Sequence, residues 1–175
     1  MAVVARQGVN LEKILLTHGH LDHVGAAGRL SDELGLPIIG PHQQDAFLFE
    51  SLAEQARMFG FPATQAFLPD QWLNDGDRVD IGKVSLSVIH CPGHTPGHVV
   101  FVNEADRLAF VGDVLFNGSV GRTDFPRGNH RDLVHSIREK LFPLGDDMHF
   151  VPGHGPMGTF GQERRTNPFV GDHAA

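Results

Sequence analysis

One short stretch of this sequence holds four side chains of the kinds that bind metal ions. The segment THGHLDHVGA, residues 17–26, contains His18, His20, Asp22 and His23. Imidazole and carboxylate groups are ligands for zinc, iron and manganese. If the segment is extended, alternate residues point the same way, so His18 and His20 can bind one ion. Asp22 and His23 follow a turn and can reach a second ion, and both ions need further ligands from elsewhere.

The remaining ligands are predicted to come from the ends of other strands. His94 lies in CPGHTPGH (91–98), Asp113 follows LAFVG, and His154 lies in PGHGP (152–156). If these strands and the one before His18 share a sheet and run the same way, their ends meet at one edge. A carboxylate has two oxygens, so Asp113 can bridge two ions. The predicted ligand sets are His18, His20, His94 and Asp113 for one ion, and Asp22, His23, His154 and Asp113 for the other.

The elements that must position these residues are short strands mixed with helices. Apolar runs and alternation predict strands over 13–17, 37–40, 78–81, 84–90, 98–103, 107–111 and 149–151. Helical spacing predicts helices over 24–34, 43–58 and 132–141. Thr159 and Gln162 have capping-box spacing, which indicates a last helix after Thr159. The mixture predicts an α/β or α+β layered sandwich, and we expect residues 1–175 to form a single domain.

The composition excludes several classes of function. The chain has 175 residues, 41% hydrophobic and 20% charged, with a formal net charge of −7. This charge argues against a nucleic-acid partner. The sequence has neither a signal-peptide pattern nor a long apolar run, so we expect a cytoplasmic protein without a membrane partner. The single cysteine, Cys91, is expected to be a small buried residue. His98 is expected either to support His94 or to cap the next strand.

The motifs, in this order, carry a resemblance to a known family. THGHLDHVGA, CPGHTPGH, GD (112–113) and PGHGP, together with LNDGDRV (73–79), VGRTDFPRG (120–128), LFPLGDD (141–147) and NPF (167–169), resemble the metallo-β-lactamase superfamily. Their order and spacing are most similar to the glyoxalase II branch, in its short bacterial form without the C-terminal helical domain. The resemblance covers nearly all of residues 10–170. It implies a four-layer αβ/βα sandwich and the seven metal ligands named above.

The same resemblance implies an activity. Glyoxalase II-like enzymes are metal-dependent hydrolases that cleave hydroxyacylglutathione thioesters, such as S-lactoylglutathione, into lactate and glutathione. Two divalent ions would lower the pKa of a water between them, and Asp22 would orient the resulting hydroxide. The leaving thiol has a pKa of about 8.5, so no strong general acid is needed. Zinc is the expected metal, and iron or manganese are accepted by the same ligands. The expected partner is a small thioester.

Substrate contacts are where the sequence departs from the glyoxalase II pattern. Arg122 and Arg127 lie in the segment where glyoxalase II places a lysine and a tyrosine that contact glutathione. Arg122 matches the lysine in charge, and both arginines are candidate substrate-binding residues. Asp124 falls near the tyrosine position, and the chain contains no tyrosine. These differences predict broader thioesterase activity with weaker selection for glutathione.

The start of the chain is a second departure. Family members carry several strands ahead of the first histidine motif, but only 17 residues precede His18. We therefore expect those N-terminal strands to be missing, which would leave a sheet edge uncovered. An alternative reading of the chain is then a metal-binding remnant without activity.

Other branches of the superfamily provide further alternatives. A persulfide dioxygenase-like enzyme shares HxHxDH and GRTDF but uses one iron, and its last histidine lies in a different context from PGHGP. An N-acyl homoserine lactonase typically uses a tyrosine, which this chain lacks. A β-lactamase generally lacks the bridging aspartate and is exported. The hydrolase is the interpretation that the motifs favour, and the sequence does not set the oligomeric state.

Overall fold

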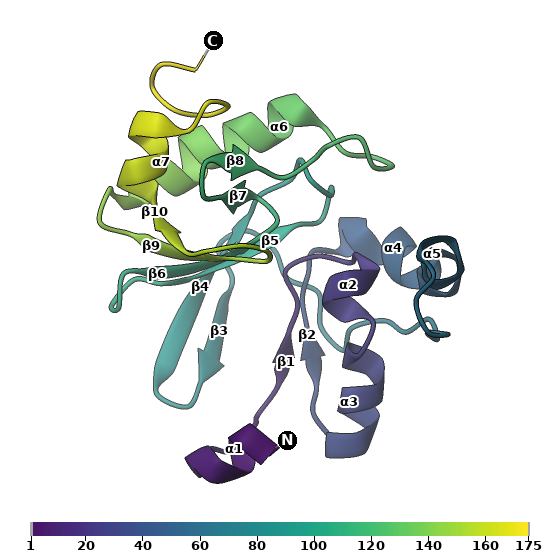
Figure 1. Ribbon diagram of the computed structural model, residues 1–175. Coiled ribbons are helices and arrows are strands. Elements are labelled where there is room, and N and C mark those ends of the chain that lie inside the picture. Colours follow the sequence, from purple (N-terminus) through teal and green to yellow (C-terminus); the bar gives the residue numbers. More distant parts are fainter. Residues whose placement is uncertain (1, 175) are drawn as a thin grey trace.

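The computed structural model describes residues 2–174, which form four layers (Figure 1). The helices are α1 (Ala2–Gln7), α2 (Leu21–Val24), α3 (Ala27–Leu34), α4 (Ala46–Glu50), α5 (Leu52–Phe59), α6 (His130–His135) and α7 (Phe160–Thr166). Further helical turns are η1 (Gln43–Asp45), the π-helical η2 (Ser136–Leu141) and η3 (Phe142–Leu144). The strands are β1 (Ile14–Leu15), β2 (Ile38–Ile39), β3 (Arg78–Ile81), β4 (Val84–His90), β5 (Val99–Asn103), β6 (Leu108–Gly112), β7 (Leu115–Phe116), β8 (Ser119–Val120), β9 (His149–Pro152) and β10 (Gly158–Thr159).

A six-stranded sheet carries most of the β-structure, in the order β10-β9-β6-β5-β4-β3. Neighbours from β3 to β6 are antiparallel, whereas β6 and β9 are parallel. Strands β4, β6 and β9 therefore run in the same direction, as predicted for the strands before His94, Asp113 and His154. The expectation that the strand before His18 joins them is wrong, because β1 pairs with β2 in a separate parallel sheet.

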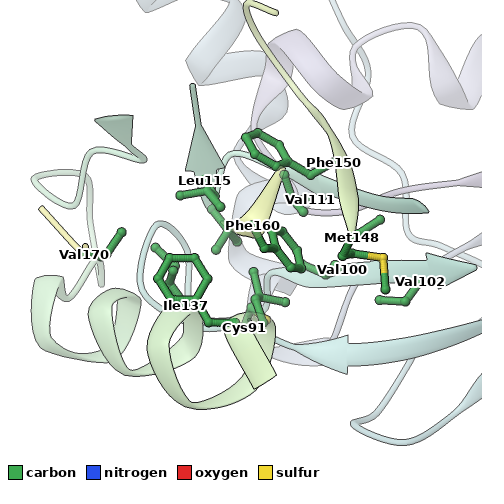
Figure 2. Close-up of a cluster of buried hydrophobic side chains, with 14 of the residues drawn as sticks. Cys91, Val100, Val102, Val111, Leu115, Ile137, Met148, Phe150, Phe160 and Val170 are labelled. Carbon is green, nitrogen blue, oxygen red and sulfur yellow. The ribbon is translucent and has the colours of Figure 1, made fainter. Parts of the chain in front are cut away.

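Three hydrophobic clusters fill the spaces between the four layers. Strand β5 is buried along its whole length, because its two faces pack against different layers. Val100 and Val102 face α6 and α7 in a cluster that also contains Phe150 and Phe160 (Figure 2). Cys91 belongs to the same cluster and is fully buried, as expected from the sequence.

The other faces of the two sheets pack against each other and against the remaining helices. Val99 and Phe101 of β5 meet Leu15 and Ile39 of the two-stranded sheet. On its outer side this small sheet packs against α2, α3 and α5 (Figure 1). This order of helix, sheet, sheet and helix is the αβ/βα sandwich that the sequence predicts. Within residues 2–13 the structure has helix α1.

The helices differ from prediction where side chains compete for backbone hydrogen bonds. The predicted helix over 43–58 consists of η1, α4 and α5, and the break between the two α-helices is at Ser51. The Ser51 hydroxyl and the Gln55 amide both donate to the carbonyl of Leu48, at 3.1 and 2.8 Å, and bend the chain there. The predicted cap is confirmed, because the Thr159 hydroxyl accepts a hydrogen bond from the backbone N–H of Gln162 at 3.2 Å. None of the helices within residues 2–174 has both the length and the apolar character needed to cross a bilayer.

Candidate metal centre

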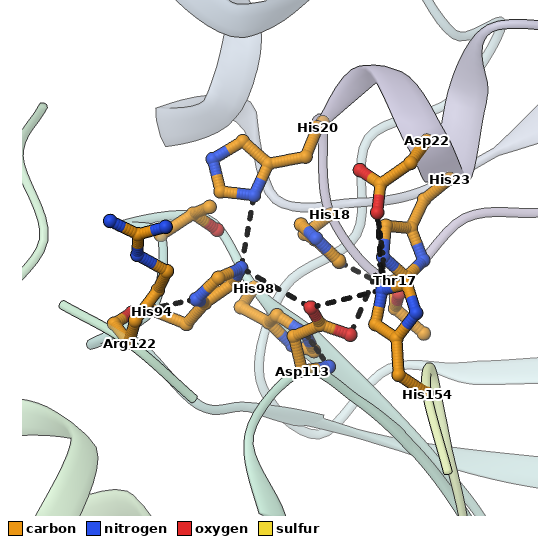
Figure 3. Close-up of polar contacts among 12 residues, drawn as sticks. Thr17, His18, His20, Asp22, His23, His94, His98, Asp113, Arg122 and His154 are labelled. Atoms are coloured by element: carbon orange, nitrogen blue, oxygen red, sulfur yellow. Dashed lines mark hydrogen bonds and ion pairs between the residues drawn. The ribbon is translucent and has the colours of Figure 1, made fainter. Parts of the chain in front are cut away.

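The two sheets bring the seven predicted ligands to one place. The loop after β1 carries His18 and His20, and Asp22 and His23 follow in the short helix α2. His94, Asp113 and His154 come after β4, β6 and β9, at the ends that these three parallel-running strands share. Side chains from the four segments point toward one another (Figure 3). The seven residues are therefore neighbours in space, although 136 positions separate the first from the last.

One group of potential ligands consists of His18, His20 and His94. One ring nitrogen from each lies within 4.8 Å of the others. His20 Nδ1 is 2.9 Å from His94 Nε2, so these two nitrogens face the same point. The Nε2 atom of His18 is fully buried and has no hydrogen-bond partner among the described residues. An unpaired buried nitrogen is costly, and a metal ion would satisfy it.

A second group consists of Asp22, His23 and His154. His154 Nε2 lies 3.1 Å from Asp22 Oδ2 and 3.2 Å from His23 Nε2. His23 Nε2 is also 3.4 Å from Asp22 Oδ2. A ring nitrogen or carboxylate oxygen from each of the three residues thus faces one space. Such a mixed set of nitrogen and oxygen ligands suits a divalent ion such as zinc, which is intermediate between hard and soft.

Asp113 lies between the two groups. Its Oδ2 atom is 3.7 Å from His94 Nε2 and 3.6 Å from His154 Nε2. Its Oδ1 atom is 3.4 Å from His23 Nε2, and this buried oxygen has no hydrogen-bond partner in the described part of the chain. Backbone approaches this carboxylate closely at Gly153, where a Cβ atom would lie 2.2 Å from Oδ1. The position of Asp113 fits a carboxylate shared by two cations.

Neighbouring groups set which ring nitrogens face the cluster. His94 Nδ1 lies 2.7 Å from the Arg122 carbonyl and must donate to it, so its Nε2 carries a lone pair. Thr17 Oγ1 lies 3.1 Å from His18 Nδ1 and allows the same tautomer there. Both rings then present the nitrogen that a metal ion requires.

Burial and mutual repulsion keep several of these imidazoles neutral. Burial lowers the pKa of His18 well below its usual value, and the neighbouring histidines lower it further. Burial also lowers the pKa of His94 and brings that of His20 to about 4. Burial opposes the charged form of His23 too, but the Asp113 and Asp22 carboxylates more than offset this and raise its pKa to about 9. The hydrogen bond from His23 in turn holds the pKa of Asp22 well below its usual range.

A buried carboxylate that the sequence did not reveal connects the two ligand loops. Asp45 is fully buried and accepts hydrogen bonds from Gly19 N at 3.0 Å, Thr95 Oγ1 at 2.8 Å and Gly97 N at 2.6 Å. Gly19 lies between two histidines of the first loop, whereas Thr95 follows His94. Burial raises the pKa of Asp45 to about 6, and the three hydrogen bonds limit this rise.

His98 has further neighbours besides those that the sequence indicated. Its Nε2 atom accepts from the backbone N–H of Asp113 at 3.1 Å. The ring also stacks on His18, with centroids 4.7 Å apart. His98 therefore supports the shared carboxylate and the His18 ring, and its ring also meets that of His94 edge-on, with centroids 6.2 Å apart.

A cleft of about 830 Å³ opens over the cluster. Five of the candidate ligands line one side of it: His20, Asp22, His94, Asp113 and His154. Its volume lies in the range of small-molecule sites. A reacting group bound in this cleft would be next to the cluster.

The two arginines predicted to bind substrate lie differently. Arg122 lines the cleft, but its guanidinium holds Asp124 through two hydrogen bonds of 2.7 and 2.6 Å. Arg127 does not line the cleft, and its guanidinium lies 4.1 Å from the ring centroid of Phe47. Their roles in substrate binding stay predictions.

The fold and the candidate metal centre are those of a known enzyme superfamily, which sequence comparison identifies. The profile of the metallo-beta-lactamase superfamily matches residues 1–154. The chain belongs to this superfamily and is an enzyme of its hydrolase class.

Individual relatives and solved structures show which members of the superfamily this chain is similar to. Hydroxyacylglutathione hydrolase GloC of Haemophilus influenzae is 53% identical over 163 residues, which cover 93% of this chain and 77% of that protein. The structure of TTHA1623 in a di-iron-bound form has a TM-score of 0.88 and 41% identity, and the match covers 96% of this chain and 82% of that one. The structure of BLEG-1 B3 metallo-beta-lactamase has a TM-score of 0.87 and 37% identity, covering 97% and 81%.

Proposed function

We propose that this chain hydrolyses thioesters of the hydroxyacylglutathione type, such as S-lactoylglutathione, using two divalent metal ions. The observation that carries the proposal is the arrangement of Asp113 between two groups of ligands, with its Oδ2 within 3.7 Å of a histidine from each group. The similarity to a hydroxyacylglutathione hydrolase supports the substrate class and does not favour a dioxygenase or an inactive remnant.

The proposed ligands divide as the sequence indicates. His18, His20 and His94 would hold one ion, Asp22, His23 and His154 the other, and Asp113 both. The buried unpaired atoms His18 Nε2 and Asp113 Oδ1 support this fit. Two bound ions would supply the acidity that produces a hydroxide from water near neutral pH, and would polarise the thioester carbonyl. Zinc is the expected metal.

The protein groups have separate tasks in this mechanism. Asp22 lines the cleft and would orient the attacking water through its carboxylate. The Arg122 carbonyl fixes the ring of His94, and His98 fixes the backbone of Asp113. The leaving thiol has a pKa of about 8.5, so it can depart as a thiolate without being protonated first. The absence of a strong general acid among the lining residues of the described chain fits this reaction.

Elemental analysis and turnover on the same purified preparation test the proposal. We expect close to two metal ions per chain and hydrolysis of S-lactoylglutathione. His154→Ala should lower both the metal content and the turnover. His149→Ala, an exposed histidine in the strand that leads to His154, is the matched control and should change neither.

Two results would contradict the proposal. One is two bound metal ions without turnover on any hydroxyacylglutathione. The other is one iron per chain with oxygen consumption on glutathione persulfide, which would favour the dioxygenase instead.

A further inference from the structure

Much of the lining of the cleft is apolar and partly open to solvent. The side chains that form this apolar wall are Phe47, Met58, Phe59, Phe61, Phe116 and Phe125. Met58, Phe59 and Phe61 are 68%, 56% and 49% exposed, although they are large and apolar. Exposed apolar side chains that cluster beside a cleft commonly mark a binding surface. Half of this wall, Met58, Phe59 and Phe61, comes from α5 and the residues just after it, which contribute none of the proposed metal ligands.

The charges around the cleft give little support to an anionic group. Arg122 is the one arginine or lysine among the lining residues in the described chain, and its guanidinium is already paired with Asp124 and stacked 4.3 Å from the ring centroid of Phe125. Glu54 adds a negative charge to the lining. Glutathione carries two carboxylates, and the lining residues of the described chain include no arginine or lysine that is free of an ion pair.

We infer that this wall binds the acyl group of the substrate, and that the enzyme prefers thioesters whose acyl group is apolar, either aliphatic or aryl. The inference rests on the proposed function, because the thioester carbonyl has to lie at the candidate metal centre, which shares the cleft with this wall. A lactoyl group is small and polar, and would leave most of the apolar wall uncovered. The thiol part then lies beyond the wall, so its charge has little effect on binding.

Binding of thioethers tests the preference apart from turnover. S-Methylglutathione and S-hexylglutathione share the glutathione part and lack the thioester that is hydrolysed, so calorimetry on the metal-loaded full chain reports affinity alone. Each fully buried methylene contributes a factor of about four, so we expect the hexyl compound to bind at least about tenfold more tightly. We also expect a more negative heat-capacity change for the hexyl compound. Equal affinities would overturn the inference.

A matched pair of exposed phenylalanines tests the position of the acyl group. Phe61→Ser should reduce the ratio of hexyl to methyl affinity by about threefold or more, because it removes apolar surface from the wall. Phe169→Ser is the control, because Phe169 is 47% exposed and does not line the cleft. Phe169→Ser should leave the ratio unchanged. Equal effects of the two variants would contradict an acyl site at this wall.

Turnover on two series of thioesters distinguishes this inference from the proposed function. We expect kcat/KM to rise from lactoyl to hexanoyl and phenylacetyl glutathione, and to follow the same order when the thiol is uncharged N-acetylcysteamine. Similar rates for all acyl groups, or an order that changes with the thiol, would overturn the inference and leave the proposed function standing. Absence of hydrolysis for every thioester would overturn the proposed function, whatever the thioethers show.

Discussion

The spacing between the loop that carries His18 and His20 and the loop that carries His94 depends on the carboxylate of Asp45. It receives two backbone N–H groups, of Gly19 and Gly97, on different oxygens. In Asp45→Asn the amide nitrogen must face one of these N–H groups whichever way the side chain turns. A buried N–H without an acceptor costs about 1–3 kcal/mol, so we expect the free energy of unfolding to fall by that amount. Urea denaturation measures this loss, and metal titration should show weaker binding.

The control for this variant is Asp32→Asn on helix α3. Asp32 is exposed, and an exposed substitution of this kind should change the free energy of unfolding by less than about 0.5 kcal/mol. If Asp45→Asn matched this control in both stability and metal affinity, the two loops would not depend on the carboxylate.

Single residues were predictable from the sequence where their chemistry is local. The histidines and aspartates of HxHxDH stand within six positions, and the later motifs repeat a pattern of strand, turn and ligand. Asp45 gave no such signal, because its partners lie 26, 50 and 52 positions away. At the start of an apolar helical pattern it looks like an ordinary acidic residue of a first helical turn.

Among the elements, helix α7 fixes the hairpin of β7 and β8 that forms part of the cleft wall. Asn167 follows α7 and donates to the Ser119 carbonyl at 3.0 Å and to Glu163 Oε2 at 2.8 Å. Glu163 Oε2 also accepts from Gly118 N at 2.9 Å. In Asn167→Ala we expect the free energy of unfolding to fall by about 1–3 kcal/mol, because buried partners lose their hydrogen bonds. The loosened hairpin should also raise KM, which steady-state kinetics will measure.

Gln162→Ala is the comparison within the same helix. Gln162 is exposed, and its contact with Thr159 uses only backbone N–H, so the change should shift stability by less than about 0.5 kcal/mol. A wild-type KM in Asn167→Ala, together with wild-type hydrogen exchange at Gly118, would show that the hairpin does not need this support.

The longer strands were predictable from the sequence for a physical reason, whereas the two-residue strands β7, β8 and β10 were not predicted. Alternation predicted β3 and β4 with the bounds that the structure has, because one face of each strand is buried and the register is fixed by that face. Helical periodicity over 43–58 is real, but it does not reveal that Ser51 and Gln55 bond to Leu48 and divide the helix. Which sheet contains β1 was also beyond the sequence, because strand pairing depends on contacts between distant segments.

At the scale of the whole molecule, the candidate metal centre lies where the two halves of the sandwich meet. His18 to His23 come from the half with the small sheet, and His94, Asp113 and His154 from the half with the six-stranded sheet. Ions bound there would add to the free energy of unfolding by an amount that grows with the logarithm of their affinity. A free metal concentration of 100 times Kd should raise the free energy of unfolding by about 2.7 kcal/mol per site. Thermal unfolding with and without a chelator measures this increase.

The same measurement on His154→Ala provides the control, because losing one ligand should reduce the increase. Zinc, iron and manganese compared in turn would rank their affinities. Identical unfolding curves for metal-loaded and chelator-treated protein would mean that the ions do not join the two halves.

The separation between ligands and cleft wall has a consequence for how such an enzyme can diverge. The ligands lie in tight loops at strand ends, where a close approach such as that at Gly153 leaves no room for change. Phe59 and Phe61, by contrast, stand at the exposed end of α5 and can be replaced without disturbing a ligand. A single substitution at either position would therefore change which acyl groups the enzyme accepts, while the metal ligands and the hydrolytic reaction stay the same.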